Sequence, residues 1–189
     1  RNINGNTVTG IAEKAFQENL KVGGIIIPDG IVTIGEYAFY RCVNMRKVSI
    51  PGSVSSIGKY AFSNCNHVET IIIPEGVASI GESAFRNCTS LTSVTIPDSV
   101  TIMGSCVFMN CVALRNVKLS ANITRIEWNT FINCVALKNV TMPDALTSIG
   151  QYAFSSCVSL ESITIPSSVT IIDRMAFNSC EKLTSVVIP

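Results

Sequence analysis

The chain has 189 residues, with 14 Lys and Arg against 13 Asp and Glu, and a formal net charge of +1. This balance excludes strong electrostatic recruitment of nucleic acid or of an anionic membrane. Because 47% of the residues are hydrophobic, the composition predicts a folded chain with a real core. No apolar run approaches the roughly 20 residues of a membrane-spanning helix, so we expect no membrane insertion.

A strict period of 23 residues organises the sequence. Every Phe and every Pro falls in such a register, and so do seven of the eight Cys. The Phe residues are Phe16, Phe39, Phe62, Phe85, Phe108, Phe131, Phe154 and Phe177. The Cys residues in register are Cys42, Cys65, Cys88, Cys111, Cys134, Cys157 and Cys180, and Cys106 is the exception. Such a repeat predicts a solenoid, because one unit cannot bury its own apolar face but stacked units can.

The repeated unit, aligned on its Pro, reads P-x-x-V-x-x-I-G-x-x-A-F-x-x-C-x-x-L-x-x-V-x-I. We expect a single solenoid over 1–189 with eight units, at 5–27, 28–50, 51–73, 74–96, 97–119, 120–142, 143–165 and 166–188. The sixth unit is irregular, with Ser120, Glu127 and Thr130 at the Pro, Gly and Ala positions. Pro189 would open a ninth unit, so we expect a fragment of a longer protein, with further repeats or a partner at the C-terminal edge.

Three elements are predicted within each unit, and the fourth unit shows them in chain order. Val77 and Ile80 are apolar positions of a returning segment and are expected to point inward. The spacing of about three between the Ala, Phe, Cys and Leu positions predicts short helical or 3-10 turns. The tail 91–96 alternates with period two, which predicts a short strand with Val94 and Ile96 inward.

The motifs of the unit resemble a known repeat family. L-x-x-V-x-I-P is a variant of the leucine-rich repeat signature, and the unit with I-G-x-x-A-F-x-x-C-x-x-L closely resembles the BspA-like, Treponema-type leucine-rich repeats. The resemblance extends over residues 5–189. It implies an α/β repeat solenoid, a leucine-rich-repeat rod with a parallel β-sheet on its concave face and the helical or 3-10 turns opposite. It also implies surface proteins of anaerobic bacteria and protist parasites, associated with adhesion to host matrix proteins and to other microbes.

The cysteine column is open to three interpretations. Neighbouring Cys would lie about 5 Å apart, within disulfide range, but each has two equally near neighbours and seven cannot all pair. A metal site needs close pairs such as C-x-x-C, and none occurs. Each Cys stands three residues after a Phe, an inward position, so we expect free thiols that fill the core. Such a column favours assembly in reducing or anaerobic surroundings.

No catalytic constellation is visible in the sequence. His67 is the single His, and the pattern places no acidic partner beside it. No G-x-S-x-G, P-loop or G-x-G-x-x-G motif occurs, so we expect no enzyme, cofactor site or metal site. N-glycosylation sequons begin at Asn87, Asn122 and Asn139, and they matter only if a eukaryote secretes the protein.

Two sets of variable positions are candidates for partner binding. The first is the outward face of the strands, where Ile72, Asn116, Lys118 and Asn139 stand in columns rich in Ser and Thr. Such a face is either a solvated sheet surface or a flat binding surface of the kind that solenoids offer.

The second set places large apolar residues of the fifth and sixth units at positions that are mostly polar in the other units. It consists of Trp128, Met109, Ile132 and Ile102. Exposed apolar clusters mark contact sites and Trp is enriched at interface hot spots, so Trp128→Ala is expected to abolish partner binding without lowering thermal stability. The alternative is local repacking, with Trp128 folded over the irregular position at Glu127.

These features favour a non-enzymatic protein-interaction module. The first hypothesis is a cell-surface or extracellular adhesion and recognition domain, with host matrix or cell-surface proteins as partners. The alternative is an intracellular scaffold, in the cytoplasm or the cytoskeleton, that docks along its length into a larger assembly. A repeat fold alone does not identify the ligand.

Overall fold

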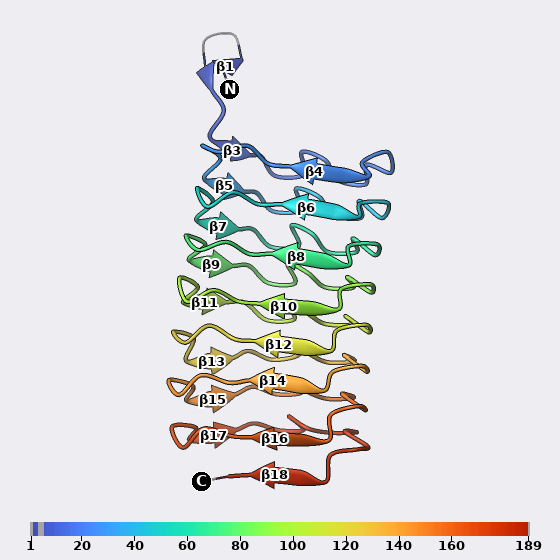
Figure 1. Cartoon of the computed structure of the whole chain (residues 1–189), viewed down its shortest axis with the longest axis vertical. Coiled ribbons are helices and arrows are strands. Elements are labelled where there is room, and N and C mark those ends of the chain that lie inside the picture. Colours follow the sequence, from blue (N-terminus) through green and yellow to red (C-terminus); the bar gives the residue numbers. More distant parts are fainter. Residues whose placement is uncertain (1, 4–5, 189) are drawn as a thin grey trace.

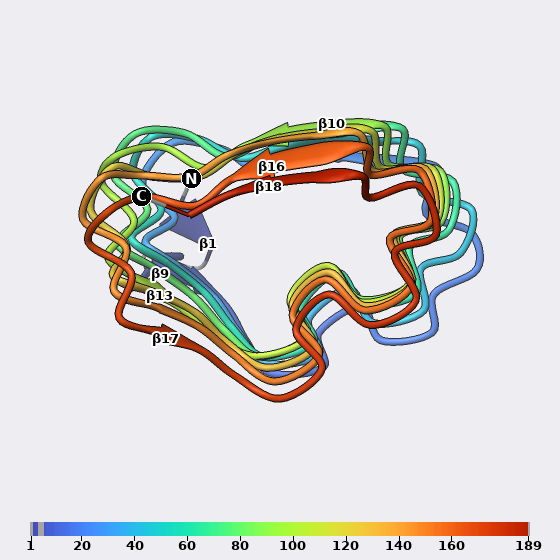
Figure 2. The ribbon, with the colours of Figure 1, turned by 90° about the horizontal axis from the view of Figure 1, so that it is seen from below.

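The computed structural model describes residues 2–3 and 6–188 and shows a rod of stacked coils (Figure 1). We call each coil a rung, and successive rungs nearly superpose when viewed along the rod (Figure 2). A small antiparallel pair, β1 (Asn2–Ile3) with β2 (Asn6–Thr7), stands at the N-terminal end. The rest of the rod is built from two sets of short parallel strands.

The first sheet consists of three-residue strands from the tails of the units. Its strands are β4 (Gly24–Ile26), β6 (Lys47–Ser49), β8 (Thr70–Ile72), β10 (Ser93–Thr95), β12 (Asn116–Lys118), β14 (Asn139–Thr141), β16 (Ser162–Thr164) and β18 (Ser185–Val187). Strands β4 to β14 form one six-stranded sheet, and β16 pairs with β18. Val94 lies opposite Val117, 23 residues on. Val94 and Ile96 are buried, which confirms the predicted strand and its inward positions.

The second sheet consists of two-residue strands from the returning segment, and the sequence patterns did not predict it. Its strands are β3 (Gly10–Ile11), β5 (Thr33–Ile34), β7 (Ser56–Ile57), β9 (Ser79–Ile80), β11 (Ile102–Met103), β13 (Arg125–Ile126), β15 (Ser148–Ile149) and β17 (Ile171–Ile172). Strands β3 to β11 form one five-stranded sheet, and β13, β15 and β17 form another group. Val77 and Ile80 are buried, as predicted.

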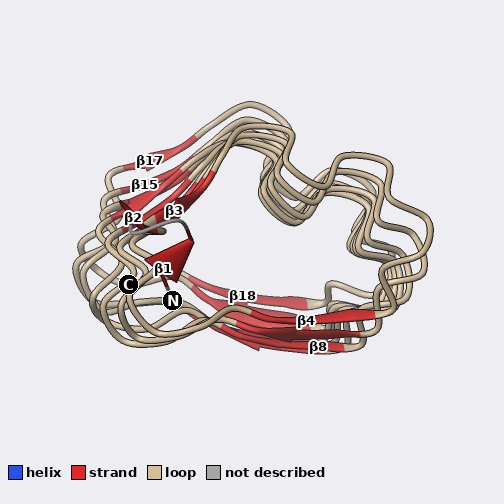
Figure 3. Ribbon diagram, turned by 90° about the horizontal axis from the view of Figure 1, so that it is seen from above, coloured by secondary structure: helices blue, strands red, loops and turns tan. Residues whose placement is uncertain are grey.

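The expectation of helical or 3-10 turns, and with it the α/β class, is wrong. No helix occurs among the described residues, and non-helical turns connect the strands (Figure 3). Ala38 N donates to Gly35 O at 3.3 Å, which closes a single β-turn, but Phe39 N donates across to Ala61 O of the next rung at 2.8 Å. Two residues of each turn also have positive φ, as Tyr37 does at 55°. A right-handed helix cannot continue through such left-handed backbone.

Two ladders of side chains fill the core. The Phe rings stack face to face along the rod, with centroid separations of 5.2 to 5.7 Å. Each in-register thiol donates to the Phe carbonyl of the preceding rung, as Cys88 Sγ does to Phe62 O at 3.3 Å. The thiols therefore occupy core space and also satisfy a buried carbonyl between rungs.

Candidate protein-binding surfaces

The outward face of the first sheet carries one column in which large and small side chains alternate. The column holds the last residue of each strand from β4 to β14: Ile26, Ser49, Ile72, Thr95, Lys118 and Thr141. Ile26 and Ile72 are 85% and 77% exposed. Apolar side chains projecting this far from a sheet are a feature of contact surfaces.

Hollows lie between the projecting side chains of this column. One of about 460 Å³ is centred on Ser49 and lined by Ile26, Lys47 and Ile72. A larger one of about 680 Å³ extends over the rungs of β8 and β10, includes Thr95, and reaches from Ile72 to Lys118. Strands β8 and β10 pair only where Thr70 faces Ser93, so the larger hollow lies where these strands part. We call this row of hollows the first-sheet groove.

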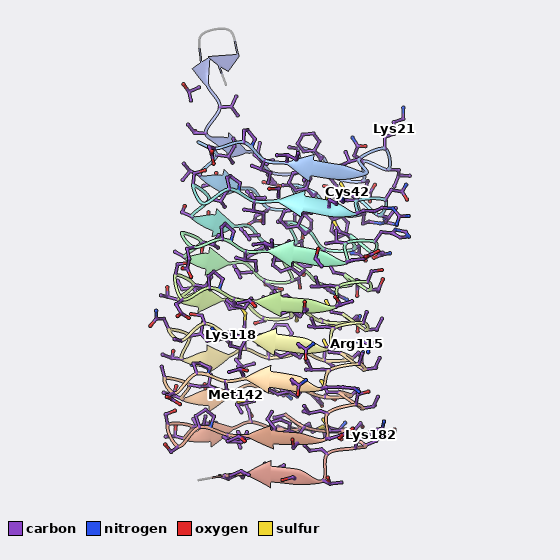
Figure 4. The ribbon with its side chains drawn as sticks, viewed as in Figure 1. Lys21, Cys42, Arg115, Lys118, Met142 and Lys182 are labelled. Carbon is purple, nitrogen blue, oxygen red and sulfur yellow. The ribbon has the colours of Figure 1, made fainter. Side chains whose placement is uncertain are left out.

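The predicted residues of the strand face all lie on this outward surface. Ile72, Asn116, Lys118 and Asn139 are exposed. Asn139 Nδ2 donates to Asn116 Oδ1 at 2.8 Å, so the amides of β12 and β14 are linked along the face. Figure 4 shows Lys118 at the end of β12, beside the neighbouring rungs. The structure therefore brings these four residues to one face.

One border of the first-sheet groove is acidic. The residue after each Pro position is a carboxylate at Asp29, Glu75, Asp98 and Asp144, and each is exposed. Glu75 and Asp98 line the hollow at Thr95. Asp98 and Asp144 line a further hollow of about 230 Å³ around Ala121. The groove thus presents apolar and hydroxyl groups together with Lys47 and Lys118 at its centre, and negative charge along one side.

The residues of the second predicted set differ in exposure. Ile102 and Trp128 are exposed, at 65% and 47%, on adjacent rungs. Ile102 borders a hollow of about 420 Å³ over the second sheet, whose lining includes neither Met109 nor Ile132. Met109 and Ile132 are half-buried in the following turn. Ile102 and Trp128 therefore remain as the exposed part of this set.

The Gly position beside Trp128 lies where the backbones of successive rungs approach closely. A Cβ atom at Gly58 would lie 2.7 Å from Glu36 N, and one at Gly150 would lie 2.8 Å from Trp128 N. Glu127 places such a Cβ at this position in the sixth unit. Here the second sheet is interrupted, since β11 and β13 belong to separate groups.

The thiols are set up for packing and not for nucleophilic chemistry. All eight Cys are free. Burial raises the pKa of Cys88 and Cys134 to about 12, partly opposed by hydrogen bonding from the backbone of Cys65 and Cys111, respectively. Burial also raises the pKa of Cys106, and the nearby Glu82 carboxylate adds to the shift. Because the thiolate is the reactive form, these thiols are unreactive at neutral pH.

The remaining polar candidates lie in separate places. Asn87 is tied into an amide ladder, donating to Asn64 Oδ1 at 2.8 Å and accepting from Asn110 Nδ2 at 2.8 Å. Asn122 is exposed and donates to Asp98 O at 2.7 Å. His67 is also exposed, with Nδ1 2.6 Å from Val43 O.

The described part of the chain lacks two further kinds of site. No three His, Cys, Asp or Glu side chains gather there in a way that could hold a metal ion. Nor does that part of the chain contain a helix long and apolar enough to span a bilayer.

The sequence patterns did not single out Ile26, although its side chain projects from the outward face of the first sheet as that of Ile72 does. Its signal was present in the sequence, because Ile26 and Ile72 stand in the same column two units apart. The alternation of large and small side chains along that column would have identified it.

Comparison with known proteins identifies relatives of the whole rod. A family model for the BspA type leucine rich repeat region matches residues 2–115 and 102–189, with 6 copies. A leucine-rich repeat protein from Bacteroides ovatus is 31% identical, with a TM-score of 0.87 over 95% of this chain and 46% of that chain. The T. pallidum leucine rich repeat protein is 28% identical, with a TM-score of 0.80 over 84% of this chain and 74% of that one.

A third similar structure is a leucine rich cell surface protein from Faecalibacterium prausnitzii. It is 29% identical, with a TM-score of 0.63 over 97% of this chain and 64% of that chain. No match was found among curated proteins. The chain spans less than half of the Bacteroides ovatus relative, so it corresponds to part of that protein. The family model matches nearly every residue, and the chain belongs to the BspA-type leucine-rich repeat family.

Proposed function

We propose that this chain is a non-enzymatic protein-interaction module that acts in adhesion or recognition at a cell surface through the first-sheet groove. The observation that carries the proposal is the row of hollows between Ile26, Ile72 and Lys118. Exposed apolar side chains set among hydroxyl groups suit protein contact without chemistry. The proposed partners are host matrix or cell-surface proteins. Support for the location comes from the Faecalibacterium prausnitzii relative, which is described as a cell surface protein.

The test is binding of the purified chain to a surface coated with a reconstituted basement-membrane matrix. Ile72→Asp places a carboxylate at the centre of the groove and should weaken binding about tenfold or more, because a partner would have to desolvate it. Ile171→Asp is the matched control, since Ile171 is 59% exposed on β17 of the second sheet. Equal binding by the two variants would exclude the first-sheet groove as the adhesive surface.

Trp128 and Ile102 offer a second candidate surface, because both are exposed at the interruption of the second sheet. Trp128→Ala belongs in the same binding assay, together with a thermal unfolding measurement. If the first-sheet groove is the binding surface, this variant binds matrix within about twofold of the original chain. Loss of binding with an unchanged unfolding temperature would instead assign adhesion to the surface around Trp128.

A second candidate function is an intracellular scaffold, and the eight free cysteines favour it. A reducing compartment keeps thiols in this state. Protease added to intact cells of the source organism distinguishes the two functions. Loss of the native protein supports a surface adhesin, whereas protection that ends when the cells are lysed supports the scaffold.

A further inference from the structure

The spacing of the hollows carries information about the backbone of the partner. The hollows at Ser49 and Thr95 lie on β6 and β10, which are separated by β8. The projecting residues Ile26, Ile72 and Lys118 follow the same alternation on β4, β8 and β12. Neighbouring parallel strands are about 4.8 Å apart, so the projecting side chains, and the recessed positions between them, repeat about every 9.6 Å along the rod.

Regular chain conformations differ in how well they match this repeat. A β-strand presents side chains on one face about every 6.7 Å. An α-helix returns to the same face every seven residues, or about 10.5 Å. A polyproline II segment rises about 3.1 Å per residue with three residues per turn, so every third side chain recurs at about 9.3 Å. The polyproline II repeat therefore comes nearest to the spacing of the groove.

Backbone hydrogen bonding also favours this conformation over a strand. The inner strands β6, β8, β10 and β12 each have a neighbour on both sides, so the face of the sheet offers no free edge for an added strand. A polyproline II segment makes no internal hydrogen bonds, and its carbonyl groups need outside donors. Thr70, Ser93 and Thr95 line the larger hollow and can donate from their hydroxyl groups.

The charge of the groove indicates the residue type on a second face of the segment. Glu75 and Asp98 border the larger hollow, and Asp144 continues the acidic side past Ala121, so carboxylates outnumber Lys118 in these two hollows. The hollow at Ser49 is lined by Lys47 and by no carboxylate, so the acidic side belongs to the part of the groove from β8 onward. A segment lying on the column turns one of its three faces toward this border. Basic side chains on that face would meet carboxylates, and apolar side chains on the first face would enter the hollows.

We propose that the first-sheet groove binds a polyproline II segment that runs along the rod, with an apolar residue at every third position and a basic residue on the adjoining face. This inference rests on the proposed function and names the chemistry of the partner. Each apolar side chain enters the hollow over Ser49 or Thr95, between the projecting side chains of the neighbouring rungs. The partner segment loses little conformational entropy on binding, because the polyproline II conformation is already populated in solution.

The probe is a fluorescent peptide with the repeat Leu-Pro-Lys, in about four copies, which is long enough to reach from β4 to β14. Fluorescence anisotropy should show saturable binding to the original chain. Ile72→Asp should weaken binding about tenfold, and Thr95→Leu, which fills the larger hollow, should weaken it about fivefold. Ile171→Asp, on the second sheet, should bind as the original chain does.

Two control peptides test the period and the charge. A scrambled peptide of the same composition should bind about tenfold more weakly, and so should a Leu-Pro-Glu repeat, because carboxylates would meet the acidic border. The inference is overturned if the scrambled peptide binds equally well, if the Leu-Pro-Lys repeat does not bind, or if Thr95→Leu has no effect.

The peptide and matrix assays separate this inference from the proposed function. If the chain adheres to matrix through Ile72 but does not bind the peptide, the proposed function stands and the polyproline II partner is excluded. If the chain binds the peptide through Ile72 but does not adhere to matrix, the specificity of the groove stands and the adhesive function is excluded.

Discussion

The second sheet is interrupted at Glu127 of the sixth unit but continuous both at rungs with Gly and at Asp173 of the eighth unit, so loss of the Gly alone does not break the pairing. At a regular rung the backbone of Gly58 approaches Glu36 N so closely that a Cβ atom would lie 2.7 Å away. The positive-φ Gly residues of the described chain are Gly30 and Gly76, so Gly58 is needed for space and not for left-handed backbone. Where Glu127 stands instead, β11 and β13 do not pair.

The two interruptions around the sixth unit have a common explanation. On the second sheet its strand β13 is separated from β11 but paired with β15. On the first sheet its strand β14 is paired with β12 but separated from β16. A tilted rung produces this pattern, because lifting one side from the preceding rung brings the other side away from the following rung. Asp173 also places a Cβ at the Gly position and β15 still pairs with β17 there, so the Cβ of Glu127 alone does not account for the lift.

The thiol column is shared by both regions and gives the largest expected effect. Folded thiols keep their protons because burial raises their pKa, whereas unfolded thiols ionise near pH 8.5. Their contribution to stability is therefore complete below about pH 8.5 and is lost as the pH rises toward the folded values. Well above pH 8.5, each buried thiol lowers the unfolding free energy by about 1.4 kcal/mol per pH unit. Cys88, Cys111 and Cys134 together therefore lower it by about 4 kcal/mol per pH unit.

Urea unfolding followed by circular dichroism between about pH 7.5 and pH 9.5 measures this loss, since the slope reports the proton difference. Cys88→Ala deletes one thiol and should reduce the average slope over this range by about 0.7 kcal/mol per pH unit, and by nearly twice as much at its alkaline end. An unfolding free energy that stays constant over this range would contradict the account.

The next largest effect tests whether the interruption reaches the core. Phe85→Ala in a regular rung and Phe131→Ala in the tilted one should each lower the unfolding free energy by about 4 kcal/mol, because both rings are buried. Phe131 stacks on its two neighbours at 5.7 and 5.2 Å, which matches the regular rungs. Chemical denaturation of both variants makes the comparison. A cost at Phe131 less than half of that at Phe85 would mean that the core is loosened as well.

A smaller effect comes from transferring the irregular residue to a regular rung. Gly58→Glu should destabilise the chain by about 3 kcal/mol, because the new Cβ overlaps the backbone of the preceding rung and the strands β5 and β7 must shift to admit it. Lys59→Glu is the control, since Lys59 is exposed and the same side chain there should change stability by less than about 0.5 kcal/mol. Hydrogen exchange of Gly58 N, which donates to Ile34 O at 2.8 Å, locates the change. Retained protection of this amide would refute the steric explanation.

The smallest effect is the reverse substitution. Glu127→Gly should bring β11 and β13 together and raise the unfolding free energy by about 0.5–1 kcal/mol, since the added pairing is partly offset by the flexibility of Gly. Glu127→Ala keeps the Cβ and should gain nothing. Thermal unfolding together with hydrogen exchange over 101–104 and 124–128 provides the measurement. Equal gains from Gly and Ala would show that the Glu charge, and not the Cβ, opens the sheet.

The period of the sequence predicted the stacking and the first sheet because core positions recur with unchanged residue types. Val94 and Ile96 could be placed inward from alternation alone. The second sheet escaped prediction because its strands have two residues, too few for alternation to be visible. The helical turns were wrong because spacing of about three also describes a chain of single turns, and sequence does not show that Phe39 N donates to another rung.

The candidate surfaces were predictable to the extent that they depend on column and register. Ile72, Asn116, Lys118 and Asn139 share a face because the strands are in register. The half-buried state of Met109 and Ile132 was not predictable, because it depends on left-handed turns at non-Gly residues such as Cys106 at φ 58°. Few non-Gly residues adopt such a conformation, and their identity gives little sign of it.

Because large and small side chains alternate along it, the first-sheet groove responds differently to the loss of one unit and to the loss of two. Removal of the single unit 74–96 would place Ile72 directly beside Lys118 and erase the hollow over Thr95. Removal of the two units 51–96 would place Ser49 between Ile26 and Lys118, and the order of projecting and recessed positions would survive. The core tolerates length changes in steps of one unit, whereas the groove tolerates them only in steps of two.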